Sequence, residues 1–220
     1  MITDYSIQAI AINAIPLIFA ITIHEAAHGY AARRFGDNTA YLLGRVTLNP
    51  VKHIDLVGTI LIPLGLILTG SPFLVGYAKP VPVNFGRLRN PRIDSIWVAL
   101  AGPGSNFFQA IIWAILLIFL LGFGINEKFF IEMAQAGMRW NLVLLVFNLF
   151  PLPPLDGGRI LSSLLPARQS IALGKLEPWG FFIVLALVFT GIIGSLWMDP
   201  LIAFFKWLLY LITLPLQMTL

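Results

Sequence analysis

Residues 6–35 read SIQAIAINAIPLIFAITIHEAAHGYAARRF, and this stretch decides the fold. It is longer than the roughly 20 apolar residues that an α-helix needs to cross the hydrocarbon core of a bilayer. Arg33 and Arg34 close the apolar run and Gly36 follows them, which indicates where the helix leaves the membrane. No basic cluster of the kind that opens a signal peptide precedes the run, so we expect the helix to be retained.

The composition places the rest of the chain in the membrane as well. Of the 220 residues, 58% are hydrophobic and 11% are charged, whereas soluble domains carry about 25% charged residues. Further apolar stretches occupy residues 94–123, 138–149, 179–197 and 201–216. We therefore predict an all-α polytopic membrane protein with about five to six transmembrane helices. Residues 1–220 are expected to form one membrane-embedded domain, with its core over about residues 6–165 and C-terminal helices over about residues 178–217.

The net charge and the lack of cysteine exclude several classes of protein. A formal charge of +4 would suggest a nucleic-acid partner for a soluble protein. In a membrane protein, however, basic residues gather on the cytoplasmic side, so we expect a lipid bilayer and no nucleic acid around this chain. The sequence contains no cysteine, which excludes disulfides, thiolate metal ligands and a cysteine nucleophile. Any metal ion must therefore be bound by His, Asp or Glu.

The pattern HEAAH at residues 24–28 lies late in the first predicted helix. Because residues four apart share a helix face, His24 and His28 can bind one zinc ion between them. Glu25 is then placed to act as the general base in metal-assisted hydrolysis. Helix packing is the alternative role for these residues. Against it, each ionisable group inside a bilayer costs about 2.5–3.5 kcal/mol, and three of them stand here within one helical turn and a half.

A catalytic zinc site commonly has three protein ligands and leaves the fourth position for water. The only histidine besides the pair is His53, which sits in a polar stretch that we expect at the membrane surface. Asp156 is the better candidate, because it closely follows the run NLFPLPP at residues 148–154, whose prolines break the regular helical backbone. Capping the next helix is the alternative role for Asp156. We predict one zinc ion bound by His24, His28 and Asp156.

Three motifs together resemble the site-2 protease family of intramembrane zinc metalloproteases. They are HEAAH at residues 24–28, AGPGSN at residues 101–106 and LDG at residues 155–157, and residues 76–84 also look like a proline-rich strand segment of that family. The resemblance implies hydrolysis of peptide bonds in the transmembrane helix of a membrane-tethered protein, near the cytoplasmic side. The sequence shows no PDZ insertion and no CBS pair, so we expect a minimal form of the family.

The same resemblance gives two asparagines a role. Asn106 ends the AGPGSN motif, and Asn148 precedes the proline-rich run before Asp156. Both look like polar groups near the metal that hold the substrate backbone or stabilise the oxyanion. Hydrogen bonding between helices is the alternative for both.

Residues 56–69 are apolar but too short for a full crossing. As a helix they would span about 21 Å, against about 30 Å for the hydrocarbon core. The apolar segments 6–35 and 94–123 must cross the membrane in opposite directions to bring their motifs to the same depth. We therefore predict a re-entrant hairpin that returns as an extended, β-like segment over residues 75–84. This segment would unwind a substrate helix by pairing with its backbone as an edge strand; an inert surface loop is the alternative.

Basic residues cluster on one side of the predicted topology. They are Arg33, Arg34, Arg45, Lys52, Lys79, Arg87, Arg89 and Arg92 between the first and third apolar segments, and Arg159, Arg168 and Lys175 after Asp156. Because basic loops stay in the cytoplasm, the metal site should face the cytoplasm. We expect a prokaryotic plasma membrane, since the chain is small and carries no targeting signal.

Two other functions fit parts of the sequence. Paired ionisable residues inside a bundle also mark the ion path of a transporter or metal carrier. Such folds contain inverted repeats, and none is found in this sequence. A catalytically silent relative acting as a membrane scaffold would not need Glu25, which is present. Hydrolysis is therefore the function that we expect.

Overall fold

The structure, a computed structural model, describes residues 7–61, 65 and 76–219. The described residues contain helices and no β-strand, which confirms the prediction of an all-α protein. The α-helices are α1 (Ile7–Arg34), α2 (Thr39–Leu42), α4 (Pro91–Gly122), α5 (Lys128–Asn148), α6 (Asp156–Leu164), α7 (Ala167–Gly174), α8 (Glu177–Phe189) and α9 (Asp199–Gln217). The 3₁₀ turns are η1 (Pro50–His53) and η3 (Phe85–Arg87), and the π-helical turns are η2 (Leu56–Leu61) and η4 (Gly194–Met198).

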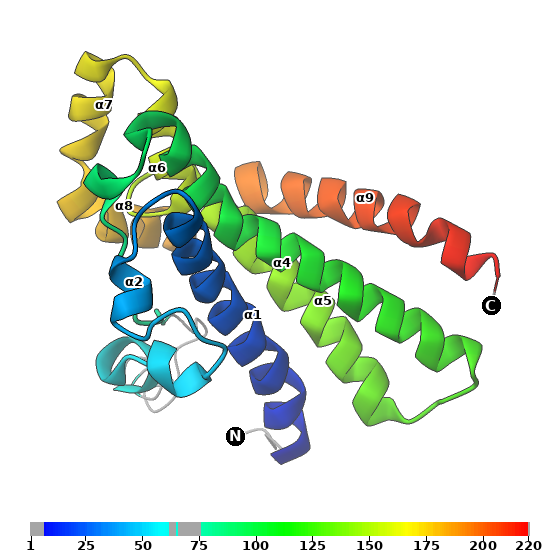
Figure 1. Cartoon of the computed structure of the whole chain (residues 1–220). Helices are drawn as coiled ribbons and strands as arrows, with labels where there is room; N and C mark the ends of the chain where they lie inside the picture. The colour runs from blue at the N-terminus through cyan, green and yellow to red at the C-terminus, as the bar shows by residue number, and fades with distance from the viewer. Residues whose placement is uncertain (1–6, 62–64, 66–75, 220) are drawn as a thin grey trace.

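Helices α1, α4 and α5 pack side by side and form the centre of the molecule (Figure 1). Small side chains fill their contacts, since Ala20 in α1, Ala110 in α4 and Ala134 in α5 are each 0% exposed. Such residues let helix backbones approach closely, which matters where lipid provides no hydrophobic driving force between helices. Leu142 of α5 and Leu209 of α9 extend this core toward the C-terminus.

Three helical stretches are long and apolar enough to cross a membrane: α1, α4 and Gly194–Gln217, which joins η4 to α9. The pair α7 and α8, bent by 68°, adds a fourth if it is counted as one span. Helix α5 packs against α1 and α4 but carries the charged residues Lys128, Glu132 and Arg139. The described residues therefore support three or four spans, and the larger number of about five to six stays a prediction.

Two predicted segments have different bounds in the structure. The helix predicted over residues 138–149 begins ten residues earlier, at Lys128. The prediction missed its first half because that half is too polar to show a continuous apolar pattern. Residues 179–197 do not form one helix, since α8 ends before Gly191, whose positive φ of 72° is a conformation that glycine adopts readily. The polar stretch after α1 contains α2 and η1.

Residues 76–84 form no regular secondary structure, but their amides bond to neighbouring elements. Tyr77 N–H donates to the Gly58 carbonyl at 3.1 Å, and Lys79 N–H donates to the His53 carbonyl at 2.9 Å. Turn η2 and the start of this segment therefore lie side by side, as the two arms of a hairpin do. The re-entrant turn predicted between them falls largely outside the described residues.

The end of α1 and the start of α4 are tied together at one end of the bundle. Arg89 N–H donates to the Phe35 carbonyl at 3.0 Å, and Asn84 N–H donates to the Asp37 carboxylate at 2.7 Å. Burial raises the pKa of the Asp37 carboxyl, but hydrogen bonds from Thr39 and Asn84 outweigh this effect and hold that pKa below its ordinary value. Helices α1 and α4 are therefore antiparallel, joined by an anionic Asp37.

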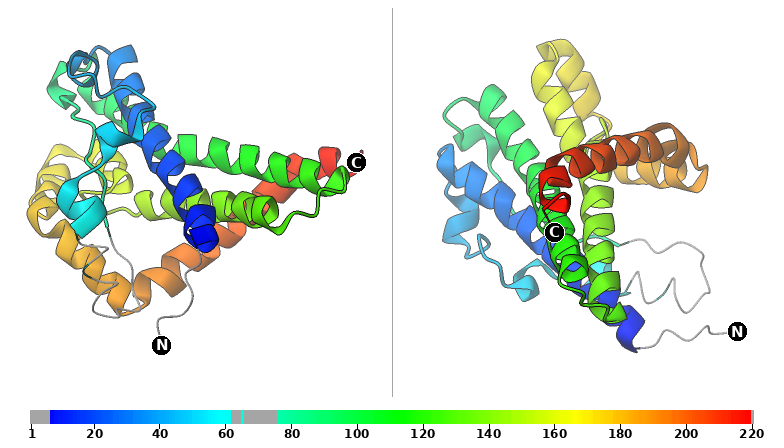
Figure 2. Two further views of the ribbon diagram at one scale, coloured as in Figure 1. Left: turned by 90° about the horizontal axis from the view of Figure 1, so that it is seen from below. Right: turned by 90° about the vertical axis from the view of Figure 1, so that its right-hand side faces the viewer.

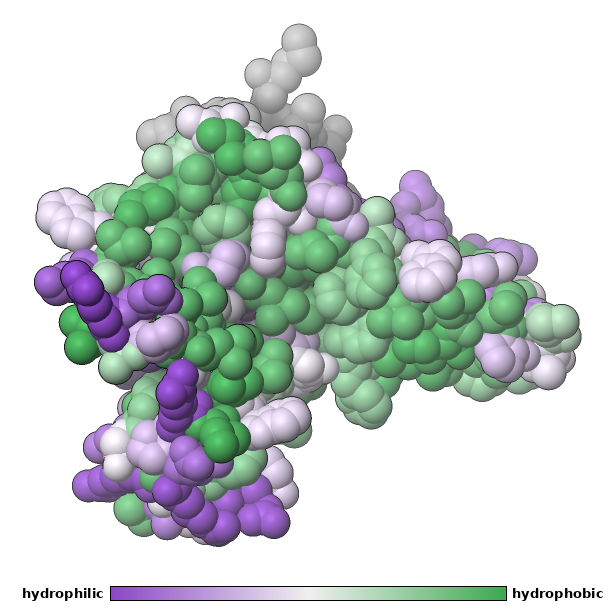
Figure 3. Space-filling model, turned by 90° about the horizontal axis from the view of Figure 1, so that it is seen from above, coloured by the Kyte–Doolittle hydropathy of each residue, from purple (hydrophilic) through white to green (hydrophobic). Residues whose placement is uncertain are grey.

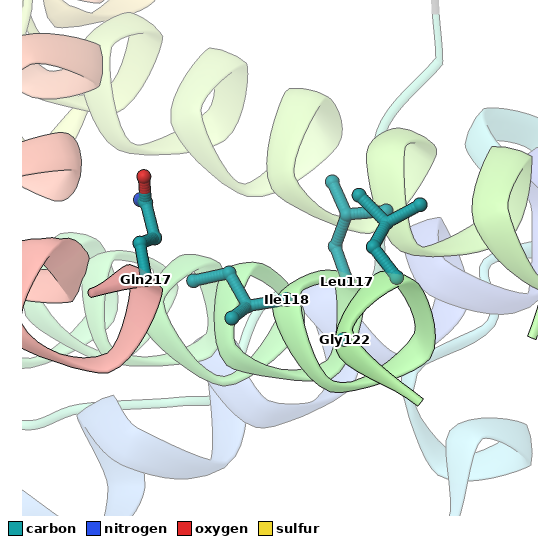
Figure 4. Close-up of a pocket in the computed structure, with 5 residues that line it drawn as sticks. Leu117, Ile118, Gly122 and Gln217 are labelled. Atoms are coloured by element: carbon teal, nitrogen blue, oxygen red, sulfur yellow. The ribbon is translucent and has the colours of Figure 1, made fainter. Parts of the chain in front are cut away.

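Helix α9 runs obliquely across the α4–α5 pair (Figure 2). The arm that these helices form is mostly apolar on its surface, whereas hydrophilic residues gather at the other end of the molecule (Figure 3). A groove of about 380 Å³ lies between the ends of α4 and α9 (Figure 4), and it is lined by Leu117, Ile118, Leu121, Gly122 and Gln217. It is at the opposite end of α4 from the AGPGSN motif.

The antiparallel arrangement predicts how single cysteines introduced into this cysteine-free chain should react. Asn38 follows α1 and Asn90 precedes α4, and both are exposed at the same end of the bundle. Asn38→Cys and Asn90→Cys should therefore react with a membrane-impermeant maleimide from the same face of the membrane. Asn126→Cys, in the exposed loop after α4, is the matched control and should react from the other face. Labelling of Asn38→Cys and Asn90→Cys from opposite faces would contradict the re-entrant hairpin.

Candidate metal centre

His24 and His28 lie one turn apart on α1, as their spacing in the sequence predicts. Their rings meet edge to face with centroids 4.6 Å apart, and their Nε2 atoms are 3.0 Å apart. Both residues are buried, with 7% and 9% of their surface exposed. The first helix of the membrane domain thus presents two imidazoles to one buried point.

Asp156 reaches the same point from α6. Its Oδ2 is 3.3 Å from His24 Nε2 and 3.4 Å from His28 Nε2. Leu155 is the N-cap of α6 and Asp156 is its first residue, so the structure does not give Asp156 the alternative role of a helix cap. Each of the three residues offers one atom that can bind a metal ion, and these atoms all lie within 4.8 Å of one another.

The hydrogen bonds around the two imidazoles occupy the nitrogens that face away from Asp156. His28 Nδ1 is 2.7 Å from the Val98 carbonyl, and His24 Nδ1 is 2.6 Å from the Asn106 side-chain oxygen. Because either oxygen can only accept, each Nδ1 carries a proton, and Nε2 is the nitrogen that each neutral ring can offer to a metal ion. The Asp156 Oδ2 beside them is buried and accepts no hydrogen bond. Three atoms of ligand type this close together can bind one cation between them.

The distances among these atoms fit zinc. Ligand atoms about 2.0–2.1 Å from a tetrahedral ion lie about 3.3–3.4 Å from one another. The three distances between the facing atoms are 3.0, 3.3 and 3.4 Å. Two imidazole nitrogens and one carboxylate oxygen make a set of three protein ligands, which is typical of catalytic rather than structural zinc.

Two glycines make room for the site. A Cβ on Gly102 would lie 2.4 Å from His28 Nε2 and 2.6 Å from His24 Cε1, so α4 packs against the histidine pair only with glycine at this position. A Cβ on Gly157 would lie 2.1 Å from the Leu149 carbonyl oxygen, so the start of α6 packs directly on the end of α5. Both glycines stand inside the motifs that carry the family resemblance. Each glycine is needed because another part of the chain packs against it, and the spacing of residues in the sequence does not predict such contacts.

Glu25 faces the proline-rich segment. Its Oε2 accepts a hydrogen bond from Val81 N–H at 2.7 Å, and Val81 is buried against Gly29 of α1. This contact holds the carboxylate beside residues 76–84, one position along α1 from His24. Sequence reasoning missed it, because the two residues are far apart in the chain and the donor is a backbone amide.

The other predicted residues lie in three different places. Asn106 is 0% exposed and contacts His24, whereas Asn148 is half-buried at the end of α5, where its Nδ2 donates to a backbone carbonyl of the same helix at 3.0 Å. His53, the alternative third ligand, is buried with its Nε2 3.0 Å from the Thr47 carbonyl and stands apart from the metal group. Contact of Asn106 and Asn148 with a substrate stays a prediction.

Comparison with known proteins places this site in a family. A family model described as Peptidase family M50 matches residues 12–138 and 130–191. The chain belongs to peptidase family M50. This is the site-2 protease family that the sequence motifs resemble, so the predicted family and the predicted zinc metalloprotease are confirmed.

Several relatives of this M50 peptidase match it over most of its length. "Putative zinc metalloprotease YwhC" of Bacillus subtilis is 39% identical over 203 residues, which cover 90% of this chain and 89% of the relative. "Putative zinc metalloprotease Rip2" of Mycolicibacterium smegmatis is 29% identical over 197 residues, 86% of this chain and 70% of the relative. "Zinc metalloprotease MJ0392" of Methanocaldococcus jannaschii is 27% identical over 158 residues, 72% of this chain and 35% of the relative. No solved structure gives a significant match.

The zinc content of purified variants tests the ligand set. Asp156→Ala removes one of three ligands, so we expect it to hold far less zinc than the parent after dialysis, measured by mass spectrometry of the metal. His53→Ala is the matched control and should keep the parent's zinc content, because His53 lies outside the metal group. Loss of zinc in His53→Ala together with full retention in Asp156→Ala would show that the third ligand is assigned wrongly.

Proposed function

We propose that this protein is an intramembrane zinc metalloprotease that hydrolyses peptide bonds in the transmembrane segments of membrane-tethered proteins. The observation that carries the proposal is the convergence of His24, His28 and Asp156 within a bundle of apolar helices. Ionisable groups at membrane depth are costly and are retained where they have a function. Membership of peptidase family M50 supports hydrolysis as that function.

The three side chains would bind one zinc ion and leave a coordination position open. When bound, zinc supplies a water molecule of lowered pKa and polarises the peptide carbonyl. His24 and His28 offer Nε2, because the Nδ1 atom of each is engaged by an oxygen acceptor, and Asp156 offers Oδ2. Asn148, which ends α5 just before the loop to Asp156, is proposed to hold the substrate backbone or the oxyanion.

Glu25 is proposed to move the proton. Its carboxylate takes a proton from the attacking water and returns it to the amine that leaves. The hydrogen bond from Val81 N–H to Oε2, at 2.7 Å, fixes the carboxylate through one oxygen and leaves the other for proton transfer. The extended segment therefore positions the base as well as running beside the site.

The substrate would pair with residues 76–84, and the contacts of this segment restrict how. The N–H groups of Tyr77, Lys79 and Val81 are already bonded within the protein. Pro80 and Pro82, on either side of Val81, have no N–H. A substrate strand added here would therefore donate most of its hydrogen bonds from its own amides to carbonyls of this segment. An unwound helix has such amides available.

We place the metal site toward the cytoplasm of a prokaryotic plasma membrane. Arg33 and Arg34 end α1, Arg92 lies in the first turn of α4, and Arg168 lies on α7 after the metal ligand of α6. Because basic residues near membrane helices are retained in the cytoplasm, this end of the bundle is the cytoplasmic one. The face from which Asn38→Cys reacts should then be the cytoplasmic face.

Removing the carboxylate of Glu25 separates metal binding from hydrolysis. Glu25→Gln should keep the parent's zinc content, because the ligands are untouched. It should lower the rate of cleavage by about 100-fold or more, because general acid–base catalysis contributes at least that much. The measurement is cleavage of purified single-span membrane proteins by the parent and the variant in the same detergent, followed on gels.

Glu132→Gln provides the control for a carboxylate lost elsewhere in the same helical bundle. Glu132 pairs with Lys128 at the exposed start of α5. It lies on a different helix from Glu25 and from the three predicted ligands. It should cleave at the rate of the parent. Substantial cleavage by Glu25→Gln would rule out Glu25 as the essential base.

A further inference from the structure

We propose that Asn141 and Asn106 form a buried relay that fixes the tautomer of His24 and so sets the affinity of the site for zinc. The proposal rests on the metal site of the proposed function and assigns a role to Asn141, which lies outside every motif used above. In this relay Asn106 holds the ring of His24, and Asn141 holds the amide of Asn106. Both are positioning residues.

The contacts form a continuous line from α5 to α1. Asn106 Oδ1 is 2.6 Å from His24 Nδ1. Asn106 Nδ2 donates to the Ala20 carbonyl at 3.2 Å and to Asn141 Oδ1 at 3.0 Å, and Asn141 Nδ2 donates to the Gly137 carbonyl at 2.9 Å. Both asparagines are 0% exposed.

The direction of these bonds determines which His24 nitrogen carries the proton. The two hydrogens of the Asn106 amide nitrogen are taken by the Ala20 carbonyl and by Asn141 Oδ1, so Asn106 must turn its oxygen toward His24. An amide oxygen only accepts, and His24 Nδ1 must therefore be protonated. His24 Nε2 is then left with a lone pair for the metal, as a zinc ligand requires.

The two metal-binding histidines differ in how firmly this tautomer is held. His28 Nδ1 faces the backbone carbonyl of Val98, which cannot be reversed. His24 faces a side-chain amide, which can rotate by half a turn and present NH₂ instead of oxygen. In that orientation Asn106 would favour a proton on His24 Nε2 and block metal binding. Asn141 Oδ1 and the Ala20 carbonyl oppose the rotation by accepting from Asn106 Nδ2, and Asn141 makes the shorter of the two bonds.

Two other roles for Asn106 explain less of the geometry. Hydrogen bonding between helices describes the contacts of Asn106 with Asn141 on α5 and with His24 on α1, but it gives no reason for the second contact to fall on a predicted metal ligand. Contact with a substrate would need a free polar atom, whereas both polar atoms of Asn106 are engaged within the protein. The geometry thus favours positioning of His24 over binding of the oxyanion.

The test uses Asn141, because it acts on His24 without touching it. Asn141→Leu keeps the size of the side chain and removes the acceptor, so it should weaken zinc binding by about 10- to 100-fold, the usual effect of losing an outer partner of a ligand. Asn141→Asp should restore the parent's affinity, because its carboxyl still accepts from Asn106. Affinity is measured on purified protein in detergent by competition with a zinc chelator.

A second measurement reports the tautomer directly. In zinc-free protein labelled with ¹⁵N-histidine, NMR distinguishes Nδ1–H from Nε2–H, and the His24 signal is identified by its loss in His24→Ala. Asn141→Leu should show a new population with the proton on Nε2, whereas the parent and Asn141→Asp should show Nδ1–H. A change in packing alone would not move this signal.

Gln109→Leu is the matched control. Gln109 is a buried amide on α4 near Asn106, 5% exposed, and its Nε2 has no hydrogen-bond partner. Its removal should change neither zinc affinity nor the His24 signal. Equal weakening of zinc binding in Gln109→Leu and Asn141→Leu would overturn the proposal, as would an unchanged affinity or tautomer in Asn141→Leu.

A double variant keeps the proposal testable if Asn141→Leu does not fold. A carboxylate at position 106 can only accept, so it holds the Nδ1–H tautomer without help from Asn141. Asn106→Asp with Asn141→Leu should therefore bind zinc as tightly as the parent, and failure to bind would contradict the relay. A parent protein that binds no zinc would instead refute the metal site itself, so the two failures are distinguishable.

Discussion

Three atoms of metal-ligand type, the Nε2 atoms of His24 and His28 and the Oδ2 atom of Asp156, converge at one buried point in a bundle of apolar helices. Lipid offers no water to compensate them, so burying the carboxylate beside two imidazoles is costly unless a positive charge lies between them. The surrounding fold serves this requirement. Helix α1 supplies His24 and His28, the proline-rich loop after α5 leads to Asp156, and α4 packs against the histidine pair.

Helix α4 carries none of the three predicted ligands, but it contacts both histidines. Gly102 lets its backbone approach the imidazoles, the Val98 carbonyl accepts a hydrogen bond from His28 Nδ1, and the Asn106 side-chain oxygen accepts one from His24 Nδ1. At its start, Arg92 donates to the backbone carbonyls that end α6, at 2.8–3.2 Å, and so ties the helix of Asp156 to the same support. A single rigid helix therefore fixes the relative positions of ligands that come from two others.

Local patterns in the sequence predict the ligands but not their support. Helical geometry alone places His24 and His28 on one face, because they are four residues apart. The prolines before Asp156 predict irregular backbone at that point. Asn141 and the Val81 amide act through contacts between helices or with a loop, and no periodicity marks them. The break at Gly191 and the polar start of α5 were missed for a related reason, since hydropathy reports burial in lipid and not the bounds of a helix.

The most direct test of this account is X-ray absorption at the zinc edge of the purified, zinc-loaded protein in detergent. The account predicts one zinc ion with two imidazole nitrogens and two oxygens at about 2.0–2.1 Å, from the histidine pair, the carboxylate and a water molecule. Scattering from the imidazole rings counts the histidines. Three imidazoles around the zinc, or none, would contradict the claim that His24, His28 and Asp156 form the metal site.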